Sequence, residues 1–336
     1  MSEPLSERAL IARITRATAL RPGVALGIGD DAAVIAGDPL TVVTQDLLVD
    51  GVHFRRATST LADIGHKAIA VNLSDVAAMG ATPVAVFIGL GLPSDAGLDA
   101  EDVDALYAGM EALAALHGVT IAGGDITRAP ALVVAVTALG HMPVGVAPVL
   151  RSTACPGDVL CVTGTLGAGA AGLLLLDQPE LAAGISEADA LRAASRRPTP
   201  RVAAGQHLAA GGVSAMMDCS DGLALDVSRL AAASHVRVEI DLETLPVAAG
   251  VTRVAQAAGR APDLLAATGG DDYELIVTAP EAVVLQMAAL DVPLTRVGRV
   301  VAGTGIALHR DGTTITVPSM GWEHRFDSRP SEPAQE

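Results

Sequence analysis

The chain has 336 residues but only one lysine, Lys67, and three cysteines, and 2% of its residues are aromatic. No G-x-x-x-x-G-K-[ST] motif surrounds the lysine, which excludes a Walker A phosphate-binding loop. The cysteines, Cys155, Cys161 and Cys219, are odd in number and lack C-x-x-C spacing. That pattern argues against a disulfide framework or a zinc site and favours a reducing compartment.

Positive charge is also scarce, because 38 acidic residues outnumber 22 lysines and arginines and leave a net charge of −16. Nucleic acids and anionic membranes attract basic surfaces, so neither partner is expected. The long uncharged runs 76–94, 130–150 and 159–176 are interrupted by glycine or proline and lack basic flanks. The first ten residues carry acids where a signal peptide is basic. We therefore expect a soluble, cytoplasmic protein.

Aspartate next to glycine or serine at the edge of an apolar run is the feature that the chain has in abundance. It occurs in GIGDD (27–31), LSD (73–75), GGD (123–125), DCSD (218–221) and GGDD (269–272), and TQD (44–46) adds a sixth aspartate at the edge of an apolar run. One such site is typical of a turn. Six predict a shared acidic cleft, where carboxylates repel one another unless cations lie between them. Mg²⁺ commonly binds one or two carboxylates together with nucleotide phosphates, so the pattern predicts a multi-magnesium nucleotide site.

Hydrophobic periodicity predicts an α+β chain. Helices are expected from Ser6 and over 61–79, 99–117, 166–176, 201–210 and 221–234. Strands are expected over 41–44, 84–90, 131–140, 158–163, 213–217, 236–240 and 273–279, before a β-rich end near residue 317. The aperiodic, proline-containing segment 141–157 predicts domains 1–150 and 151–327, with a disordered tail at 328–336. Asp75 falls on the apolar face of helix 61–79, where a carboxylate is either paired or bound to a metal.

Gly167, Gly169 and Gly172 match G-x-G-x-x-G after a predicted strand. A dinucleotide-binding fold then needs a second strand that ends in an acid about 20 residues further on. Here that stretch reads DALRAASRRPTP, which is helical and then interrupted by proline. We interpret these glycines as sites of close helix packing.

Seven segments together resemble the thiamine-monophosphate kinase family: GIGDDAAV, TQDLLVDGVHF, KAIAVNLSDVAAMGATP, GGDITR, TGTLG, DCSDGLALD and GGDDYEL. The resemblance implies a two-domain fold like that of aminoimidazole ribonucleotide synthetase. The N-terminal domain would bind ATP and Mg²⁺ and pair its sheet in a homodimer, and a C-terminal α/β sandwich would complete the cleft. The implied reaction is direct in-line transfer of a phosphoryl group from ATP to thiamine phosphate, assisted by several Mg²⁺ ions. Its acceptor oxygen is already ionised, so no catalytic residue is expected beyond the metal ligands.

The resemblance also assigns residues. The metal ligands would be Asp31, Thr44, Gln45, Asp46, Asp75, Asp125, Asp218 and Asp221. ATP would contact Tyr107, Gly124, Asp125, Arg151 and Ser220, and thiamine phosphate would contact His53, Asp271 and Trp322. Gln45 stands where serine or threonine is commoner, so its main-chain carbonyl is the expected ligand. Asp271 is one methylene shorter than the usual glutamate, and we expect its contact to run through water.

Several residues keep a second interpretation. Packing or surface roles stay open for His53, Tyr107, Arg151 and Trp322, and Lys67 is expected to pair with Asp63 on the same helix. Asp30 and Asp272 are expected to be turn or supporting acids. Asp226 is either a supporting acid or a solvated helix residue.

Other functions stay open as well. Residues 1–30 lack the cysteine and lysine of selenophosphate synthetase, and the last cysteine, Cys219, is far from the C-terminal cysteine of the hydrogenase-maturation protein. An activity like that of aminoimidazole ribonucleotide synthetase is an alternative. A non-catalytic metal- or nucleotide-binding module is another, although no D-x-[DN]-x-[DN]-G loop supports it.

Overall fold

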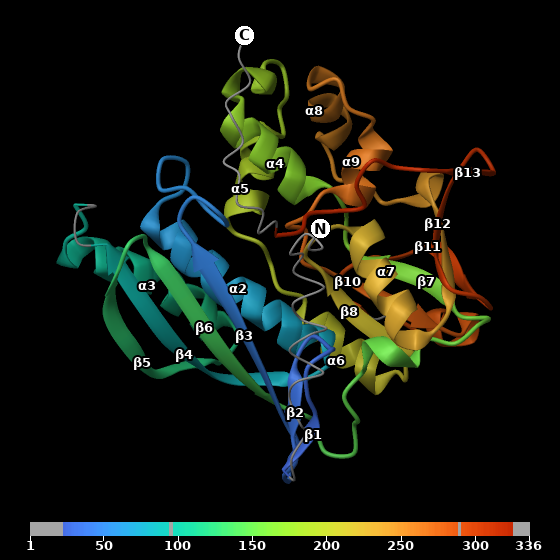
Figure 1. Ribbon diagram of the computed structural model, residues 1–336, viewed down its shortest axis with the longest axis horizontal. Coiled ribbons are helices and arrows are strands. Elements are labelled where there is room, and N and C mark those ends of the chain that lie inside the picture. Colours follow the sequence, from blue (N-terminus) through green and yellow to red (C-terminus); the bar gives the residue numbers. More distant parts are fainter. Residues whose placement is uncertain (1–22, 94–96, 288–289, 325–336) are drawn as a thin grey trace, which may run out of the picture.

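The computed structural model describes residues 23–93, 97–287 and 290–324. The helix expected from Ser6 and the tail 328–336 lie outside these residues. Two β-sheets organise the described chain, one on each side of the molecule in Figure 1, and helices pack on both. This arrangement confirms the α+β fold class. No helix in the described ranges is long and apolar enough to cross a membrane.

The first sheet has six strands in the order β1 (Val24–Leu26), β2 (Ala33–Ile35), β3 (Thr41–Val49), β6 (Val133–His141), β4 (Thr82–Pro93) and β5 (Thr120–Ala129). β4 and β5 run parallel, and the other described neighbours run antiparallel. Alternation along β6 buries Val134 and Val136 completely, as expected for a sheet with one covered face. The strand predicted over 41–44 continues to Val49, and β5 was not predicted because its GGD sequence is typical of a turn.

Helices α2 (Leu61–Ala78) and α3 (Ala100–Leu116) cover the buried face of this sheet. Helix α2 begins at a capping box, in which the Thr60 side chain accepts from the backbone of Asp63 and the Asp63 side chain accepts from that of Thr60. The two helices approach closely because glycines meet backbone. A Cβ on Gly65 would lie 2.0 Å from the carbonyl oxygen of Leu106, and one on Gly109 would lie 2.0 Å from that of Ala62.

The second sheet has seven strands in the order β13 (Thr313–Ile315), β12 (Gly305–Arg310), β9 (Arg237–Asp241), β11 (Leu294–Val301), β7 (Val159–Thr163), β10 (Glu274–Ala279) and β8 (Ala215–Cys219). β9 and β12 run parallel, and the other described neighbours run antiparallel. Strands β7, β8 and β10 are buried along their whole length. Helices are needed on both faces of this part of the sheet to exclude water.

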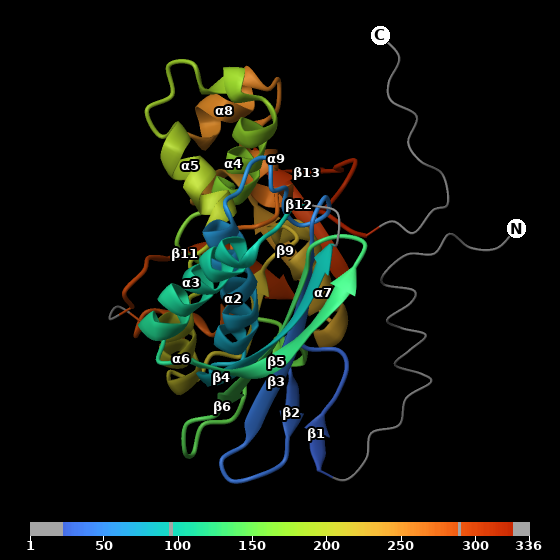
Figure 2. The ribbon, with the colours of Figure 1, turned by 90° about the vertical axis from the view of Figure 1, so that its left-hand side faces the viewer.

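The helices of the second half are α4 (Ala168–Asp177), α5 (Ala188–Arg196), α6 (Val202–Ala210), α7 (Leu223–Ser234), α8 (Val251–Ala257), α9 (Pro262–Thr268) and α10 (Glu281–Val284). Short 3-10 turns lie at η1 (Arg151–Thr153), η2 (Pro179–Ala182) and η3 (Leu242–Thr244). Figure 2 shows α4, α5 and α8 grouped at one end of the molecule, far from β1 and β2. Helix α5 lies in the stretch DALRAASRRPTP that was expected to be helical before its prolines, whereas α8, α9 and α10 were not predicted, because each is short and adjoins proline or polar residues.

The largest hydrophobic cluster joins the two halves of the chain. It packs Ile69 and Met79, at α2, against Leu208 of α6, Met216 of β8 and Leu275 of β10. A buried apolar contact of this kind holds the two sheets in a fixed relation. The domain limits at 150 and 327 stay a prediction.

The glycines of the G-x-G-x-x-G segment pack closely, as interpreted from the sequence. A Cβ on Gly169 would lie 2.3 Å from the carbonyl oxygen of Asp271, and one on Gly172 would lie 2.0 Å from that of Leu191. Helix α4 therefore rests directly on α5 and on the loop before β10.

Candidate active site

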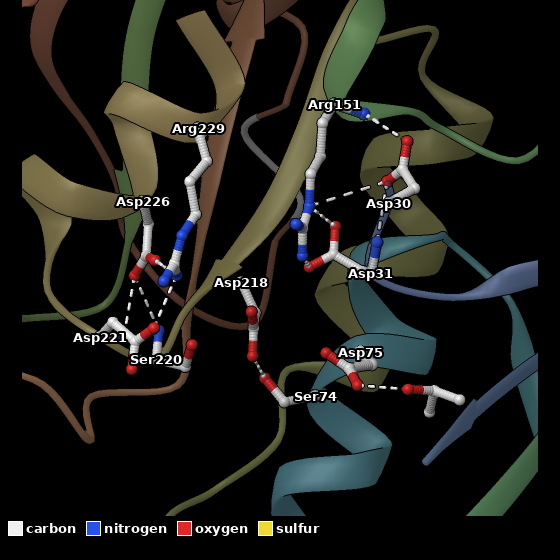
Figure 3. A network of polar contacts seen from close by, with 11 residues as sticks. Asp30, Asp31, Ser74, Asp75, Arg151, Asp218, Ser220, Asp221, Asp226 and Arg229 are labelled. Carbon is white, nitrogen blue, oxygen red and sulfur yellow. Dashed lines mark hydrogen bonds and ion pairs between the residues drawn. The ribbon is translucent and has the colours of Figure 1, made fainter. Parts of the chain in front are cut away.

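Three carboxylates from distant parts of the chain meet between the two sheets (Figure 3). Asp31 lies before β2, Asp75 near the end of α2 and Asp218 within β8. Each offers an oxygen atom, and these atoms all lie within 4.8 Å of one another. The hydroxyl of Thr44 donates to Asp75 at 2.5 Å, and that of Ser74 donates to Asp218 at 2.8 Å. Oxygen donors this close together suit a hard divalent cation.

Burial and mutual repulsion make this cluster costly to ionise. Burial first, and then the charges of Asp46, Asp218 and Asp31, raise the pKa of Asp75 well above its ordinary value. The pKa of Asp218 is raised well above its ordinary value by burial and then by Asp31. Burial, followed by Asp221 and Asp31, raises the pKa of Asp46 to about 6. Bound cations would relieve this repulsion.

Two arginines border the carboxylates. Arg151 donates from Nε and Nη2 to the two oxygens of Asp31, at 2.8 and 2.6 Å. Burial alone would lower the pKa of Arg151, but Asp31 holds it above its ordinary value. Arg229 on α7 donates from Nη1 to Asp221 at 2.6 Å and to Asp226 at 2.7 Å. A guanidinium fork held in this way can exchange a carboxylate for a phosphate.

Asp226 supports the loop that carries Ser220 and Asp221. Its Oδ2 accepts from the backbone N–H groups of Ser220, Asp221 and Gly222 at 3.1, 3.0 and 3.2 Å. The side chain is fully buried, and burial followed by the Asp221 charge raises its pKa to about 7. Of the two interpretations left open, the structure therefore supports the buried, supporting acid.

The cluster opens into a cavity of about 700 Å³. Asp46, Asp75, Asp218, Ser220 and Asp221 line one part of it, and His53, Asp271, Trp322 and His324 line another. Each of these residues except His324 was predicted from the sequence as a site residue, and the structure places them around one cavity. The only signal for His324 was its position two residues after the single tryptophan.

Three aromatic rings stand against one another in this cavity. The ring centroids of Trp322 and His324 lie 4.2 Å apart, and those of His53 and His324 lie 5.3 Å apart. Trp322 remains 44% exposed, and its backbone N–H donates to the carbonyl of Asp221 at 3.0 Å. Burial, followed by the charges of His324 and Lys67, lowers the pKa of His53, which favours the neutral ring. These rings form a wall suited to a flat heteroaromatic group.

The prediction that Lys67 pairs with Asp63 was wrong. Asp63 pairs with Arg197 instead, and the Lys67 ammonium lies 2.7 Å from Oδ2 of Asp271. Lys67 therefore pairs with Asp271, 204 residues further along the chain, and not with Asp63 on its own helix. This lysine therefore belongs to the cavity.

The acids next to the expected ligands serve as turn and cap residues, one of the roles expected for them. Asp30 accepts from the backbone N–H groups of Asp31 and Arg151, both at 3.0 Å. Asp272 accepts from those of Gly167 and Gly169 at 2.7 and 3.1 Å, which caps the start of α4.

The remaining expected residues lie apart from this cavity. The side chain of Gln45 is exposed and accepts from Thr137 at 3.0 Å. Tyr107 is half-buried on α3, and Gly124 and Asp125 are exposed on β5. The row that crosses the sheet from Asp46 to Gly124 runs through Val136 and Ile88, which spans roughly 14 Å at the usual strand spacing. The metal-binding roles of Gln45 and Asp125 and the ATP contacts of Tyr107, Gly124 and Asp125 stay predictions.

Comparisons with known proteins point to one family. Family models of the AIR synthase related protein match residues 29–142 for the N-terminal domain and residues 155–311 for the C-terminal domain. The thiamine-monophosphate kinase of Rhodopirellula baltica is 38% identical over 313 residues, covering 89% of this chain and 91% of the relative. That of Bacillus subtilis is 36% identical over 332 residues, covering 95% and 99%. A solved structure of AaThiL complexed with AMPPCP and TMP matches with a TM-score of 0.83 at 32% identity, covering 95% and 97%.

Replacing Asp226 with alanine should disorder the Ser220–Asp221 loop. The change leaves three backbone N–H groups without their acceptor and leaves Arg229 with Asp221 as its carboxylate partner, which should lower the free energy of unfolding by about 2 kcal/mol or more. It should also weaken binding of Mg²⁺ with ATP in calorimetric titration. Asp189→Ala is the matched control, because Asp189 forms the same i,i+3 pair with Arg192 but is 98% exposed. Equal effects of the two substitutions would show that Asp226 does not support the loop.

Proposed function

The chain belongs to the thiamine-monophosphate kinase family, and we propose that it transfers the γ-phosphoryl group of ATP directly to thiamine phosphate. The observation that carries the proposal is the close set of Asp31, Asp75 and Asp218, of which Asp75 and Asp218 line one part of a cavity whose other part has an aromatic wall. An oxygen of thiamine phosphate forms the new bond to the γ-phosphorus as the bond to the ADP oxygen breaks. Because that oxygen is already ionised, no proton has to be removed.

The side chains divide this work between them. The carboxylates would hold several Mg²⁺ ions, whose charge screens the two polyanions from each other. Arg151 is placed to bind an ATP phosphate once Asp31 is taken by a cation, since its fork already lies at the cluster. His53 and Trp322 would bind the thiamine rings, and an indole face attracts the cationic thiazolium. Ser220 lines the same cavity, on the loop whose backbone N–H groups donate to Asp226.

We further propose that the protein works as a homodimer through the exposed face of its first sheet. This face presents the large apolar side chains of Leu47 and Phe87, which are 48% and 43% exposed. Asp125 lies in the same cross-strand row as Leu47, through Ala135 and Gly89. Directly paired residues share a face, so Asp125 is on the exposed face.

Asp46, in contrast, lies on the covered face, in a row with the buried Val136 and Ile88. Asp125 therefore points away from the aspartate cluster of its own chain. We propose that the partner subunit, where it covers this exposed face, places its own cluster beside Asp125. This arrangement would reconcile a metal-ligand role for Asp125 with its distance from Asp75 within one chain.

The proposed reaction predicts a narrow choice of acceptor. With ATP and Mg²⁺, thiamine phosphate should be phosphorylated and free thiamine should not, because transfer to the alcohol of thiamine requires removal of a proton, whereas the phosphate oxygen is already ionised. ADP release should be measured with thiamine phosphate, thiamine and formylglycinamidine ribonucleotide in parallel. Turnover of thiamine or of the ribonucleotide, with none of thiamine phosphate, would refute the assignment.

Mixed dimers test whether Asp125 acts across the interface. Asp75→Asn and Asp125→Asn should each abolish most activity when prepared alone. Unfolding and refolding the two variants together should restore about a quarter of the wild-type activity, because half of the dimers are mixed and each has one complete site. A mixture that stays inactive, although sedimentation shows dimers, would place Asp125 in the site of its own chain or outside it.

A further inference from the structure

The only lysine of the chain is buried at the junction of the two halves. Lys67 lies on α2 with 8% of its side chain exposed. Its ammonium is 2.7 Å from Oδ2 of Asp271 and 3.4 Å from the carbonyl oxygen of His53. The other oxygen of Asp271, Oδ1, accepts from the hydroxyl of Tyr273 at 3.0 Å. Both oxygens of this carboxylate are therefore held by donors.

The backbone of Asp271 is held as firmly as its side chain. Asp271 and Tyr273 have φ angles of 69° and 51°, a left-handed conformation that is costly outside glycine and persists where the surroundings impose it. The N–H of Asp271 donates to the carbonyl of Ser220, and that of Tyr273 donates to the carbonyl of Cys219, both at 2.8 Å. The carboxylate thus has one position, which Lys67 fixes from the opposite half of the molecule.

This position faces the cavity beside the aromatic wall. Lys67, His53, Asp271, Trp322 and His324 all line it. A carboxylate that is already paired with an ammonium attracts a further cation only weakly. Its oxygens still have lone pairs, so it remains a good hydrogen-bond acceptor.

We propose that Lys67 is a positioning residue that makes Asp271 an acceptor for the amino group of the substrate's aminopyrimidine ring. The thiazolium cation would then be bound by the rings of Trp322 and His53 rather than by Asp271. This inference rests on the proposed function and deepens it, because it names the substrate group that the Lys67–Asp271 pair recognises.

The first test is a comparison of variants with thiamine phosphate. Lys67→Met should raise the KM for thiamine phosphate about tenfold or more, the value of one charge-assisted hydrogen bond. The KM for ATP should change less than about twofold, since the hydrogen bonds of Lys67 go to His53 and Asp271, which are predicted substrate residues and not ATP residues. The double variant Lys67→Met/Asp271→Asn should be no worse than Asp271→Asn alone, because Lys67 acts through Asp271.

Arg197→Met is the control for the loss of an ion pair between the two halves. Arg197 binds Asp63 of α2 but does not line the cavity. This variant should lose some thermal stability and keep both KM values. Equal KM changes in Lys67→Met and Arg197→Met, or additive effects in the double variant, would overturn the proposal.

The second test replaces the amino group itself. Oxythiamine phosphate carries an oxygen at that position, so wild-type protein should bind it about tenfold more weakly than thiamine phosphate. Lys67→Met and Asp271→Asn should lose this discrimination. Emission from Trp322, the single tryptophan, measures both affinities without ATP. Binding without turnover would count against the proposed reaction alone, whereas equal affinity of wild type for both compounds would refute the role of Lys67.

Discussion

Repulsion among the carboxylates of Asp31, Asp75 and Asp218 is the constraint on which the rest of this structure depends. Oxygens held within 4.8 Å of one another resist ionisation unless positive charge or hydrogen-bond donors lie between them. The protein supplies hydroxyl donors from Thr44 and Ser74 but keeps its nearest guanidinium, Arg151, to one side. The centre of the cluster is left for cations, and the reaction that we propose brings two more polyanions to them.

Helix α2 is the element that connects the acidic cluster to the substrate cavity. It is buried between the two sheets, and a single face carries Lys67, Ser74 and Asp75 into the site over little more than two turns. Asn72 on the same helix accepts from the backbone of Asp46 and so positions β3 as well. Glycine contacts with α3 and apolar contacts with β8 keep this helix in place. The chemistry of the site and the packing of the core therefore constrain the same residues.

Much of the site could be predicted from the sequence, because several of its residues belong to short local sequence patterns. Helical spacing put Asp75 on a buried face, the repeated aspartate pattern predicted a shared acidic cleft, and the family resemblance singled out Asp31 and Asp218 in it. Long-range choices could not be predicted: Lys67 prefers Asp271 to Asp63, and the fully buried Asp226 binds three backbone N–H groups that no pattern reveals. Strand β5 was missed because glycine and aspartate indicate a turn, so the place of Asp125 on the exposed face became visible only from the register of the sheet.

The most direct test of the central constraint is the thermal unfolding of wild type and Asp75→Asn, with and without Mg²⁺ and in the absence of nucleotide. A carboxylate whose pKa is raised by folding lowers the free energy of unfolding as the pH rises from the pKa of the unfolded state toward that of the folded state. The metal-free wild type should therefore be destabilised by Asp75 at a pH of about 7.5. Asp75→Asn should therefore unfold at a temperature no lower than that of wild type without Mg²⁺, and Mg²⁺ should stabilise it less. A variant that is less stable without metal, and that gains as much from Mg²⁺ as wild type does, would contradict this account.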